Sequence, residues 1–266
     1  MKAQDLHLLE LLELEPEAGR ISFKNRRMLL WDADAFGHLR KELIESLGVD
    51  RARPILSRFG FANDYRDCLT TGRLFNWDDD AEWWLSCPAL QRSEGKVQAE
   101  PTHLHVDRAA GEFEMEVTWK GAYEAAQHQR MFGSAEHPVC WTLTGYASGF
   151  STALMGEEVF VVETECMATG GSICRVVGKT RRAWGVRGDE LACDYKAQPL
   201  AVELDSRESD LRRQERALAR KEREINKLRG SMLRTRSGIT GKSPALGRVL
   251  DLAETVARVD TTVLIT

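Results

Sequence analysis

The stretch VFVVETECMATGGSICRVVGK, residues 159–179, carries the clearest structural signal in the chain. Two runs rich in β-branched side chains flank a turn at Gly170-Gly171, which is a pattern typical of an antiparallel β-hairpin. Cys166 ends the first run and Cys174 lies in the second. Because a hairpin places its strands side by side, this one can bring two thiols together.

Outward from this hairpin, the earlier segments alternate between helical and strand patterns. Apolar residues spaced three and four apart indicate helices, and period-two alternation indicates strands. The expected elements, in chain order, are a helix capped by Asp34 and ended by Gly48, a second helix with Ile55, Leu56, Phe59 and Phe61 on its apolar side, a hairpin of strands 96–107 and 112–119, a helix from Tyr123 to Gly133, and a buried helix over 137–154. We therefore expect an α+β fold of helices mixed with antiparallel hairpins.

The composition excludes several classes of protein. The 266 residues carry a net charge of −4, so a chain-wide basic surface for nucleic acid is not expected. No run approaches the roughly 18 apolar residues that a bilayer crossing needs. The six cysteines follow an acidic N-terminus without an apolar signal segment, which indicates a reducing, cytoplasmic location. In that compartment, clustered cysteines point to metal before disulfide.

A charged segment follows the quoted hairpin. Residues 203–236 contain 11 basic and 7 acidic side chains, without an aromatic residue or a proline. One apolar column recurs every seven residues: Leu204, Leu211, Leu218, Ile225 and Met232. The companion column is mostly polar, so the segment is either a solvated single helix or a weak coiled-coil linker, and we favour the coiled coil. The last residues, 244–266, predict a helix and then a strand at 262–266.

Four residues form a candidate metal site. Cys140, Glu163, Cys166 and Cys174 supply thiolates and a carboxylate, which are good zinc ligands in a tetrahedral set of four. Glu163 and Cys166 are three residues apart, an odd offset that places them on opposite faces of a regular strand. A bulge or bend is therefore needed if both bind. From spacing alone the alternative stays open that these cysteines are small buried hydrophobic residues.

The chain resembles the sensor domain of aromatic-responsive, sigma-54-dependent transcription activators of the NtrC class. The residues that carry the resemblance are Pro138-Val139-Cys140-Trp141, Gly145-Tyr146-Ala147-Ser148-Gly149-Phe150, Glu163-Thr164-Glu165-Cys166, Gly170 and Cys174-Arg175-Val176-Val177-Gly178-Lys179. The resemblance implies a zinc site of three cysteines and one glutamate, which maps onto Cys140, Glu163, Cys166 and Cys174. A filled ligand set implies structural zinc, because catalytic zinc keeps an open position. Cys68, Cys87 and Cys193 are then left for packing.

The same resemblance implies a closed apolar pocket for a small aromatic effector. By position, the effector-binding residues are Trp84, Gln91, Val117, Trp119, Phe150 and Val161. Trp119 stands where the family has a tryptophan that meets the effector hydroxyl, although a strand tryptophan can also simply fill a core. Gln91 replaces a histidine that hydrogen-bonds phenols. An amide differs from histidine in reach and cannot become charged, so we expect a substituted or non-phenolic aromatic rather than phenol itself.

The resemblance also implies a domain organisation and partners. The expected parts are an N-terminal arm or dimer contact at 1–20, the N-terminal part of the sensor at 21–135, a zinc-binding, 4-vinyl-reductase-like part at 136–200, a coiled-coil linker at 201–237, and the start of an AAA+ ATPase domain, truncated before Walker A, at 238–266. The expected partners are a second copy in a homodimer, the adjoining ATPase and, through the full-length protein, sigma-54 RNA polymerase and DNA. No enzyme activity is expected of this segment.

Two other classes of protein are carried as alternatives. The first is a zinc- or thiol-dependent enzyme that uses Cys140, Cys166 or Cys174. The second is a purely structural dimerisation module in which the aromatic residues only fill the core. Metal analysis with a thiol-reactivity assay discriminates the first from a sensor. A thermal-shift screen with aromatic compounds discriminates the second, because a ligand that binds only the native state raises its stability.

Overall fold

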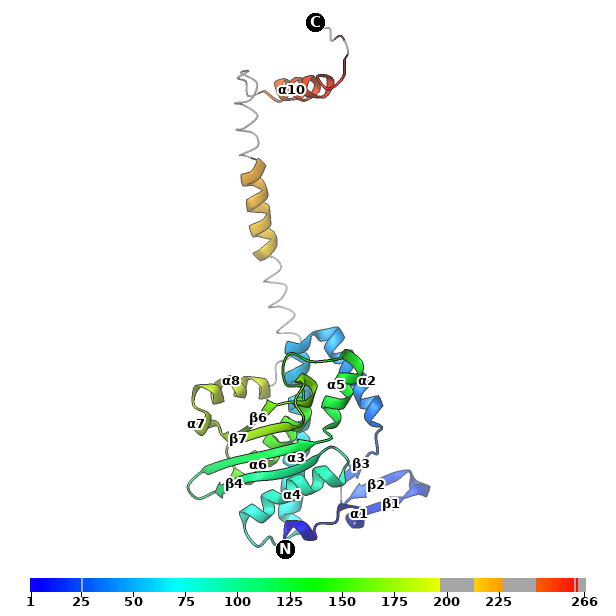
Figure 1. The fold of residues 1–266 in the computed structure, drawn as a ribbon, viewed down its shortest axis with the longest axis vertical. Coiled ribbons are helices and arrows are strands. Elements are labelled where there is room, and N and C mark those ends of the chain that lie inside the picture. Colours follow the sequence, from blue (N-terminus) through cyan, green and yellow to red (C-terminus); the bar gives the residue numbers. More distant parts are fainter. Residues whose placement is uncertain (25, 197–212, 227–242, 261, 263–266) are drawn as a thin grey trace. The chain divides into compact units, whose positions relative to one another are not determined.

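The computed structural model describes residues 1–266 except 25, 197–212, 227–242, 261 and 263–266. The chain divides into two units, residues 1–196 and residues 197–266. Unit 1 is an α+β structure, as expected from the sequence (Figure 1). Among the described residues, the helices are either too short or too polar to cross a bilayer.

Two long helices follow one another without a loop. Helix α2 spans Ala33–Leu47 and helix α3 spans Val49–Leu74, with Gly48 between them at a positive φ of 78°. The cap of α2 is Asp32, whose carboxylate accepts from the backbone N–H of Asp34, so the expectation that Asp34 is the cap is wrong by two residues. The side chain of Asp34 instead binds Arg130 of helix α5, which spans Tyr123–Phe132.

The central helix α6, Trp141–Met155, packs against α3 with almost no side chain between them (Figure 1). A Cβ added at Gly145 would lie 2.1 Å from the backbone oxygen of Ser57, and one added at Gly60 would lie 2.1 Å from that of Thr142. Only glycine allows this approach, and it explains why the segment is rich in small residues. The helix begins four residues later than the expected start at His137.

A four-stranded antiparallel sheet joins the two expected hairpins. Strands β4, Gln98–Asp107, and β5, Glu112–Lys120, form the first hairpin, and β6, Val159–Glu165, and β7, Cys174–Thr180, form the second. The strand order is β4-β5-β7-β6, so the hairpins meet along β5 and β7. The pairing of β6 with β7 shifts between Glu163 and Glu165, which is the bulge that the odd spacing required.

The N-terminal residues form a small sheet and pack on the core. The elements, in order, are η1 Ala3–Asp5, α1 Leu8–Leu11, β1 Leu12–Glu15, η2 Pro16–Ala18, β2 Arg20–Phe23 and β3 Arg26–Met28. Segment 1–20 was expected as an arm or a dimer contact, but Ala3, Leu6 and Leu8 are buried. Leu6 and Leu8 belong to the main core. Apolar side chains keep this segment on the body.

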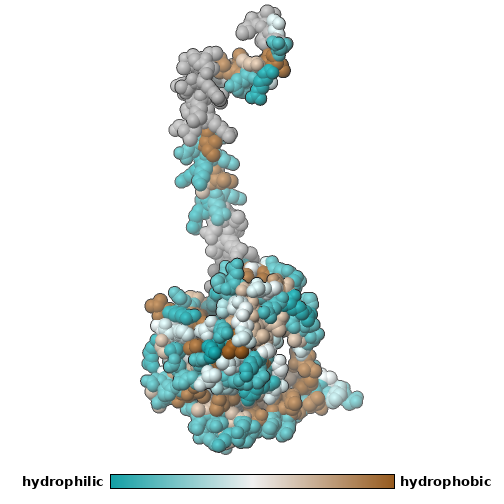
Figure 2. All heavy atoms as spheres, viewed as in Figure 1, coloured by the Kyte–Doolittle hydropathy of each residue, from teal (hydrophilic) through white to brown (hydrophobic). Residues whose placement is uncertain are grey.

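The remaining elements complete each unit. In unit 1, α4 spans Asp80–Ser93, η3 spans Met167–Thr169, α7 spans Arg181–Trp184 and α8 spans Val186–Tyr195. In unit 2, residues 213–226 are helical and α10 spans Pro244–Val256. The space-filling view shows hydrophilic side chains mixed with apolar ones along the described linker helix, where Leu218 and Ile225 are exposed (Figure 2).

Several linker and C-terminal predictions fall outside the described residues. Leu204, Leu211 and Met232 are among them, so the heptad column is described only at Leu218 and Ile225. The predicted strand 262–266 is described only at Thr262, which has no regular structure.

Candidate functional site

The four candidate metal ligands meet in the core of unit 1. Donor atoms of Cys140, Glu163, Cys166 and Cys174 all lie within 4.8 Å of one another, and all four residues are buried. The Sγ atoms of Cys140 and Cys174 are 3.9 Å apart, and those of Cys174 and Cys166 are 4.0 Å apart. Tetrahedral zinc with Zn–S bonds of about 2.3 Å separates two sulfurs by roughly 3.8 Å. The spacing of the thiols therefore fits a tetrahedral metal ion.

Glu163 is held at this cluster by one oxygen and offers the other. Its Oε2 accepts from the backbone N–H of Cys140 at 2.9 Å. Its Oε1 is buried and has no hydrogen-bond partner among the described residues. A buried oxygen without a partner is costly, because it has lost water without replacement. A metal ion beside the three thiols would satisfy it.

The acid groups at this site disfavour one another's ionisation. Burial, followed by the nearby Cys166 thiol, raises the pKa of Glu163 to about 8. Hydrogen bonds with Cys166 and Cys174 raise the pKa of Cys140, while the same kind of bond from Cys140 and Cys174 lowers the pKa of Cys166. The protein alone thus stabilises negative charge on one sulfur. Ionising all four groups requires a cation at their centre.

A buried ion pair supports the chain beside Cys140. Arg40 Nη1 of α2 lies 2.5 Å from Glu124 Oε1 of α5, and both side chains are at most 2% exposed. The Glu124 carboxylate also accepts from the backbone N–H groups of Thr142 and Leu143, which are at the start of α6. Arg40 Nη2 donates to the carbonyl of Val139 at 2.7 Å. Sequence analysis missed this pair, whose members are 84 positions apart.

The six predicted effector-binding residues are all in the interior of unit 1. None is more than 4% exposed: Trp84, Gln91, Val117, Trp119, Phe150 and Val161. The five apolar members belong to one hydrophobic cluster. The sixth, the amide of Gln91, has polar partners on α3 and α4.

The strand residues of both predicted sites share one face of the sheet. Trp119 pairs with Cys174, and Val117 pairs with Val176, across β5 and β7. Val176 in turn pairs with Glu163 across β7 and β6. Directly opposite residues lie on the same face of a sheet. The predicted effector wall and the metal ligands are therefore continuous along that face.

Two helices face this wall. Trp84 of α4 donates from its indole Nε1 to Ser151 Oγ of α6 at 2.9 Å, and its ring lies 6.0 Å from that of Phe113 on β5. Phe150, the neighbour of Ser151, is fully buried on α6. Together α4, α6 and the sheet enclose the predicted effector residues.

A buried polar cluster lies behind Gln91. Gln91 Nε2 is 3.4 Å from Asp64 Oδ2, and Asp64 Oδ1 is 3.4 Å from Lys96 Nζ. Lys96 also pairs with Glu94 at 2.5 Å. Burial alone would lower the pKa of Lys96, but the carboxylates of Asp64 and Glu94 outweigh it and raise the pKa above its usual range. Of this cluster the sequence analysis named only Gln91, because charged residues in a helical pattern are ordinarily solvated.

The other three cysteines divide two to one. Cys68 and Cys87 are buried, which agrees with packing. Cys193 is exposed, so its assignment to packing is wrong. It lies near the end of α8, and its Sγ is 3.5 Å from the carbonyl of Asp189 in the preceding turn.

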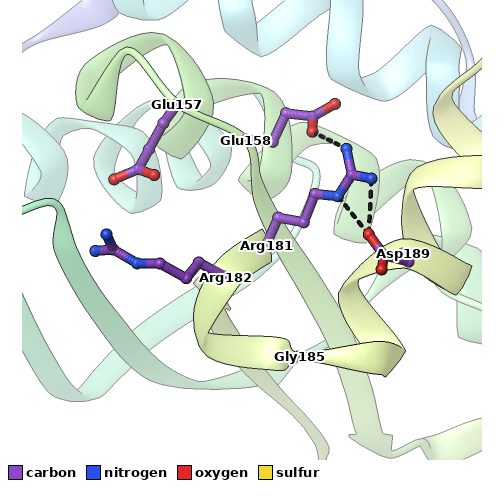
Figure 3. A pocket seen from close by; sticks show the side chains of 6 residues that line it. All are labelled: Glu157, Glu158, Arg181, Arg182, Gly185 and Asp189. Carbon is purple, nitrogen blue, oxygen red and sulfur yellow. Dashed lines mark hydrogen bonds and ion pairs between the residues drawn. The ribbon is translucent and has the colours of Figure 1, made fainter.

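A surface hollow between α7, α8 and the start of β6 lies apart from these residues. It is lined by Glu157, Glu158, Arg181, Arg182, Gly185 and Asp189 (Figure 3). Arg181 is engaged on both sides, at 2.7 Å from Glu158 and 2.7 Å from Asp189. Its charge is satisfied within the protein.

The fold and site thus define a class of protein: an α+β domain with a buried Cys3Glu cluster beside an apolar core. Two family models match it, one described as an activator of aromatic catabolism over residues 7–107 and one as a 4-vinyl-reductase domain over residues 115–180. The phenol-responsive sensory domain of the transcription activator PoxR, solved with phenol, is 34% identical. That match covers 72% of this chain and 94% of that one, with a TM-score of 0.69.

The chain belongs to the family of aromatic-responsive, sigma-54-dependent transcription activators, as part of their sensor region. The phenol regulator MopR of Acinetobacter guillouiae is 32% identical over 204 residues, which are 77% of this chain and 36% of MopR. The transcriptional regulatory protein XylR of Pseudomonas putida is 29% identical over 197 residues, 73% of this chain and 35% of XylR. The chain spans about a third of the length of these curated relatives. They are regulators rather than enzymes.

Proposed function

We propose that residues 1–196 bind a single-ring aromatic effector and report its presence to the rest of a transcription activator. The observation that carries this proposal is the shared sheet face, on which Trp119 lies opposite the metal ligand Cys174. An apolar wall anchored by a rigid centre is a pre-organised binding site, which reduces the entropy lost when a ligand binds. The family relationship supplies the ligand class.

We propose that Cys140, Glu163, Cys166 and Cys174 hold one zinc ion. The thiol spacing and the partnerless Glu163 oxygen support this assignment. Bound zinc supplies folding free energy and a fixed geometry. Four protein ligands leave no position for a reacting water, which argues against a hydrolytic role.

The effector site is proposed to comprise Trp84, Gln91, Val117, Trp119, Phe150 and Val161. Hydrogen bonds within the described residues satisfy the indole of Trp84 through Ser151 and the amide nitrogen of Gln91 through Asp64. The described residues provide no acceptor for the indole N–H of Trp119. A ligand oxygen or nitrogen can fill that role.

The remaining organisation is proposed from the family. Residues 136–200 form the metal-binding part of the sensor, residues 201–237 a coiled-coil linker, and residues 238–266 the start of an AAA+ ATPase domain. The proposed partners are a second copy in a homodimer, sigma-54 RNA polymerase and DNA through the full-length protein, and the proposed location is the cytoplasm. Effector binding would change the state of the linker and release the adjoining ATPase.

Metal analysis and a thermal-shift screen on the zinc-loaded chain test this proposal. We expect one zinc per chain and a rise in melting temperature with at least one single-ring aromatic. Trp119→Phe should reduce the shift, whereas Trp31→Phe, at a tryptophan that is 60% exposed, should leave it unchanged. A shift that survives Trp119→Phe, or no response to any aromatic, would contradict the proposed site.

A further inference from the structure

The buried polar cluster behind Gln91 fixes which atom of its amide is available. Gln91 follows Trp84 by seven positions and Cys87 by four, so the three side chains share one face of α4. Trp84 and Cys87 lie in the hydrophobic core. Gln91, at 2% exposed, extends the same inward face.

Both hydrogen bonds of the Gln91 side chain leave from its nitrogen. Nε2 lies 3.4 Å from Asp64 Oδ2 and 3.5 Å from Cys87 Sγ. An ionised carboxylate can only accept, so the amide must turn its NH2 group toward Asp64. The carbonyl oxygen is then turned away from Asp64.

Asp64 is itself held in place. Its Oδ1 accepts from Asn63 Nδ2 at 3.1 Å and lies 3.4 Å from Lys96 Nζ, and its side chain is 4% exposed. Lys96 in turn lies over the ring of Tyr146, 3.8 Å from the ring centroid. These contacts pair Asp64 with a cation and leave it little freedom to move.

We propose that Asp64 is a positioning residue that makes Gln91 a hydrogen-bond acceptor for the effector, and that the site therefore takes aromatics bearing a donor group, such as phenols. This inference rests on the proposed effector site. A hydroxyl group accepts from Trp119 Nε1 and donates to Gln91 Oε1, so it satisfies both. An ether such as anisole can only accept, and toluene can do neither.

This inference revises the sequence-based expectation that phenol is disfavoured. That expectation treated the amide as free to donate or accept. With its donor side occupied by Asp64, Gln91 offers the effector the same polarity as a neutral histidine nitrogen that accepts a proton.

Calorimetric titration of the zinc-loaded chain with phenol, anisole and toluene tests the proposal. We expect phenol to bind about tenfold or more tightly than either analogue, since each analogue leaves a buried polar group unpaired. In Asp64→Asn the neighbouring amide can donate or accept, so Gln91 is free to turn. The preference for phenol over anisole should then fall about tenfold, with toluene affinity within about twofold of the wild-type value.

The controls separate this inference from the proposed function. Asp107→Asn, at an exposed hairpin position, should keep the wild-type preference. If Asp64→Asn does not fold, Gln91→Leu provides the test, and phenol should then bind it no better than toluene. Equal affinity of the wild-type chain for phenol and anisole, or an unchanged preference in Asp64→Asn or Gln91→Leu, overturns the inference. Failure of all three compounds to bind the folded wild-type chain overturns the proposed function instead.

Discussion

At the scale of single residues, buried charge is the dominant feature of this domain. Glu163 and Glu124 are both buried carboxylates, yet they differ in how they are satisfied. Glu124 has Arg40 and two backbone N–H groups, whereas Glu163 has one backbone N–H and one oxygen left over among the described contacts. Burial raises the pKa of both. The difference indicates a structural ion pair in one case and a metal ligand in the other.

The Arg40–Glu124 pair gives a stability prediction. Arg40→Met leaves the buried Glu124 charge without its partner and should lower the free energy of unfolding by about 3–5 kcal/mol. Arg130→Met breaks the exposed pair with Asp34 and should cost about 1 kcal/mol or less. Urea unfolding of the zinc-loaded chain measures both. Similar losses in the two variants would show that the buried pair has no special role.

Asp67 gives a pH prediction. Burial, followed by the neighbouring Asp64 carboxylate, raises its pKa to about 7, against about 3.9 in an unfolded chain. The folded state therefore holds the proton more tightly. The stability that this proton contributes is fully present below about pH 4 and is lost as the pH rises through about 7.

Asp67→Asn cannot ionise, so its free energy of unfolding should fall less than that of the wild-type chain between about pH 5 and 8. Urea unfolding at a series of pH values provides the measurement. Parallel curves for the variant and the wild-type chain would refute this assignment. The exposed Asp107→Asn serves as the control and should track the wild-type curve.

At the scale of elements, the contact of α3 with α6 determines where the site lies. Glycines on both helices let the backbones touch, so α6 sits deep in the domain with Cys140 at its start and Phe150 further along. The bulge in β6 then brings Glu163 and Cys166 to the same ion-sized space. One close helix contact and one strand irregularity thus assemble ligands from three elements.

This helix contact predicts a large effect from a single methyl group. Gly145→Ala places a Cβ 2.1 Å from the Ser57 carbonyl oxygen, and it should lower the free energy of unfolding by about 1–3 kcal/mol or more. Gly247→Ala is the matched control, because a Cβ there meets no atom within 4 Å. It should leave the unfolding of residues 1–196 unchanged. Equal behaviour of the two variants in thermal unfolding would contradict the packing described.

At the scale of the whole molecule, the sequence predicts features that depend on local spacing. The hairpin around Gly170-Gly171, the bulge and the four metal-ligand candidates follow from short-range patterns, and the structure agrees with them. The Arg40–Glu124 pair and the orientation of Gln91 by Asp64 could not be predicted. Both join residues far apart in the chain, and the choice of partner depends on how α2, α3, α4 and α5 pack. The burial of segment 1–20 was missed for the same reason.

The central claim is that an aromatic effector lies against Trp119 beside a structural zinc ion. A crystal structure of the zinc-loaded chain with phenol, recorded at the zinc absorption edge, tests it most directly. We predict one anomalous peak among Cys140, Glu163, Cys166 and Cys174, and a ring whose hydroxyl lies within hydrogen-bond distance of Trp119 Nε1 and Gln91 Oε1. Phenol bound elsewhere, or no metal peak at the four ligands, would contradict the account.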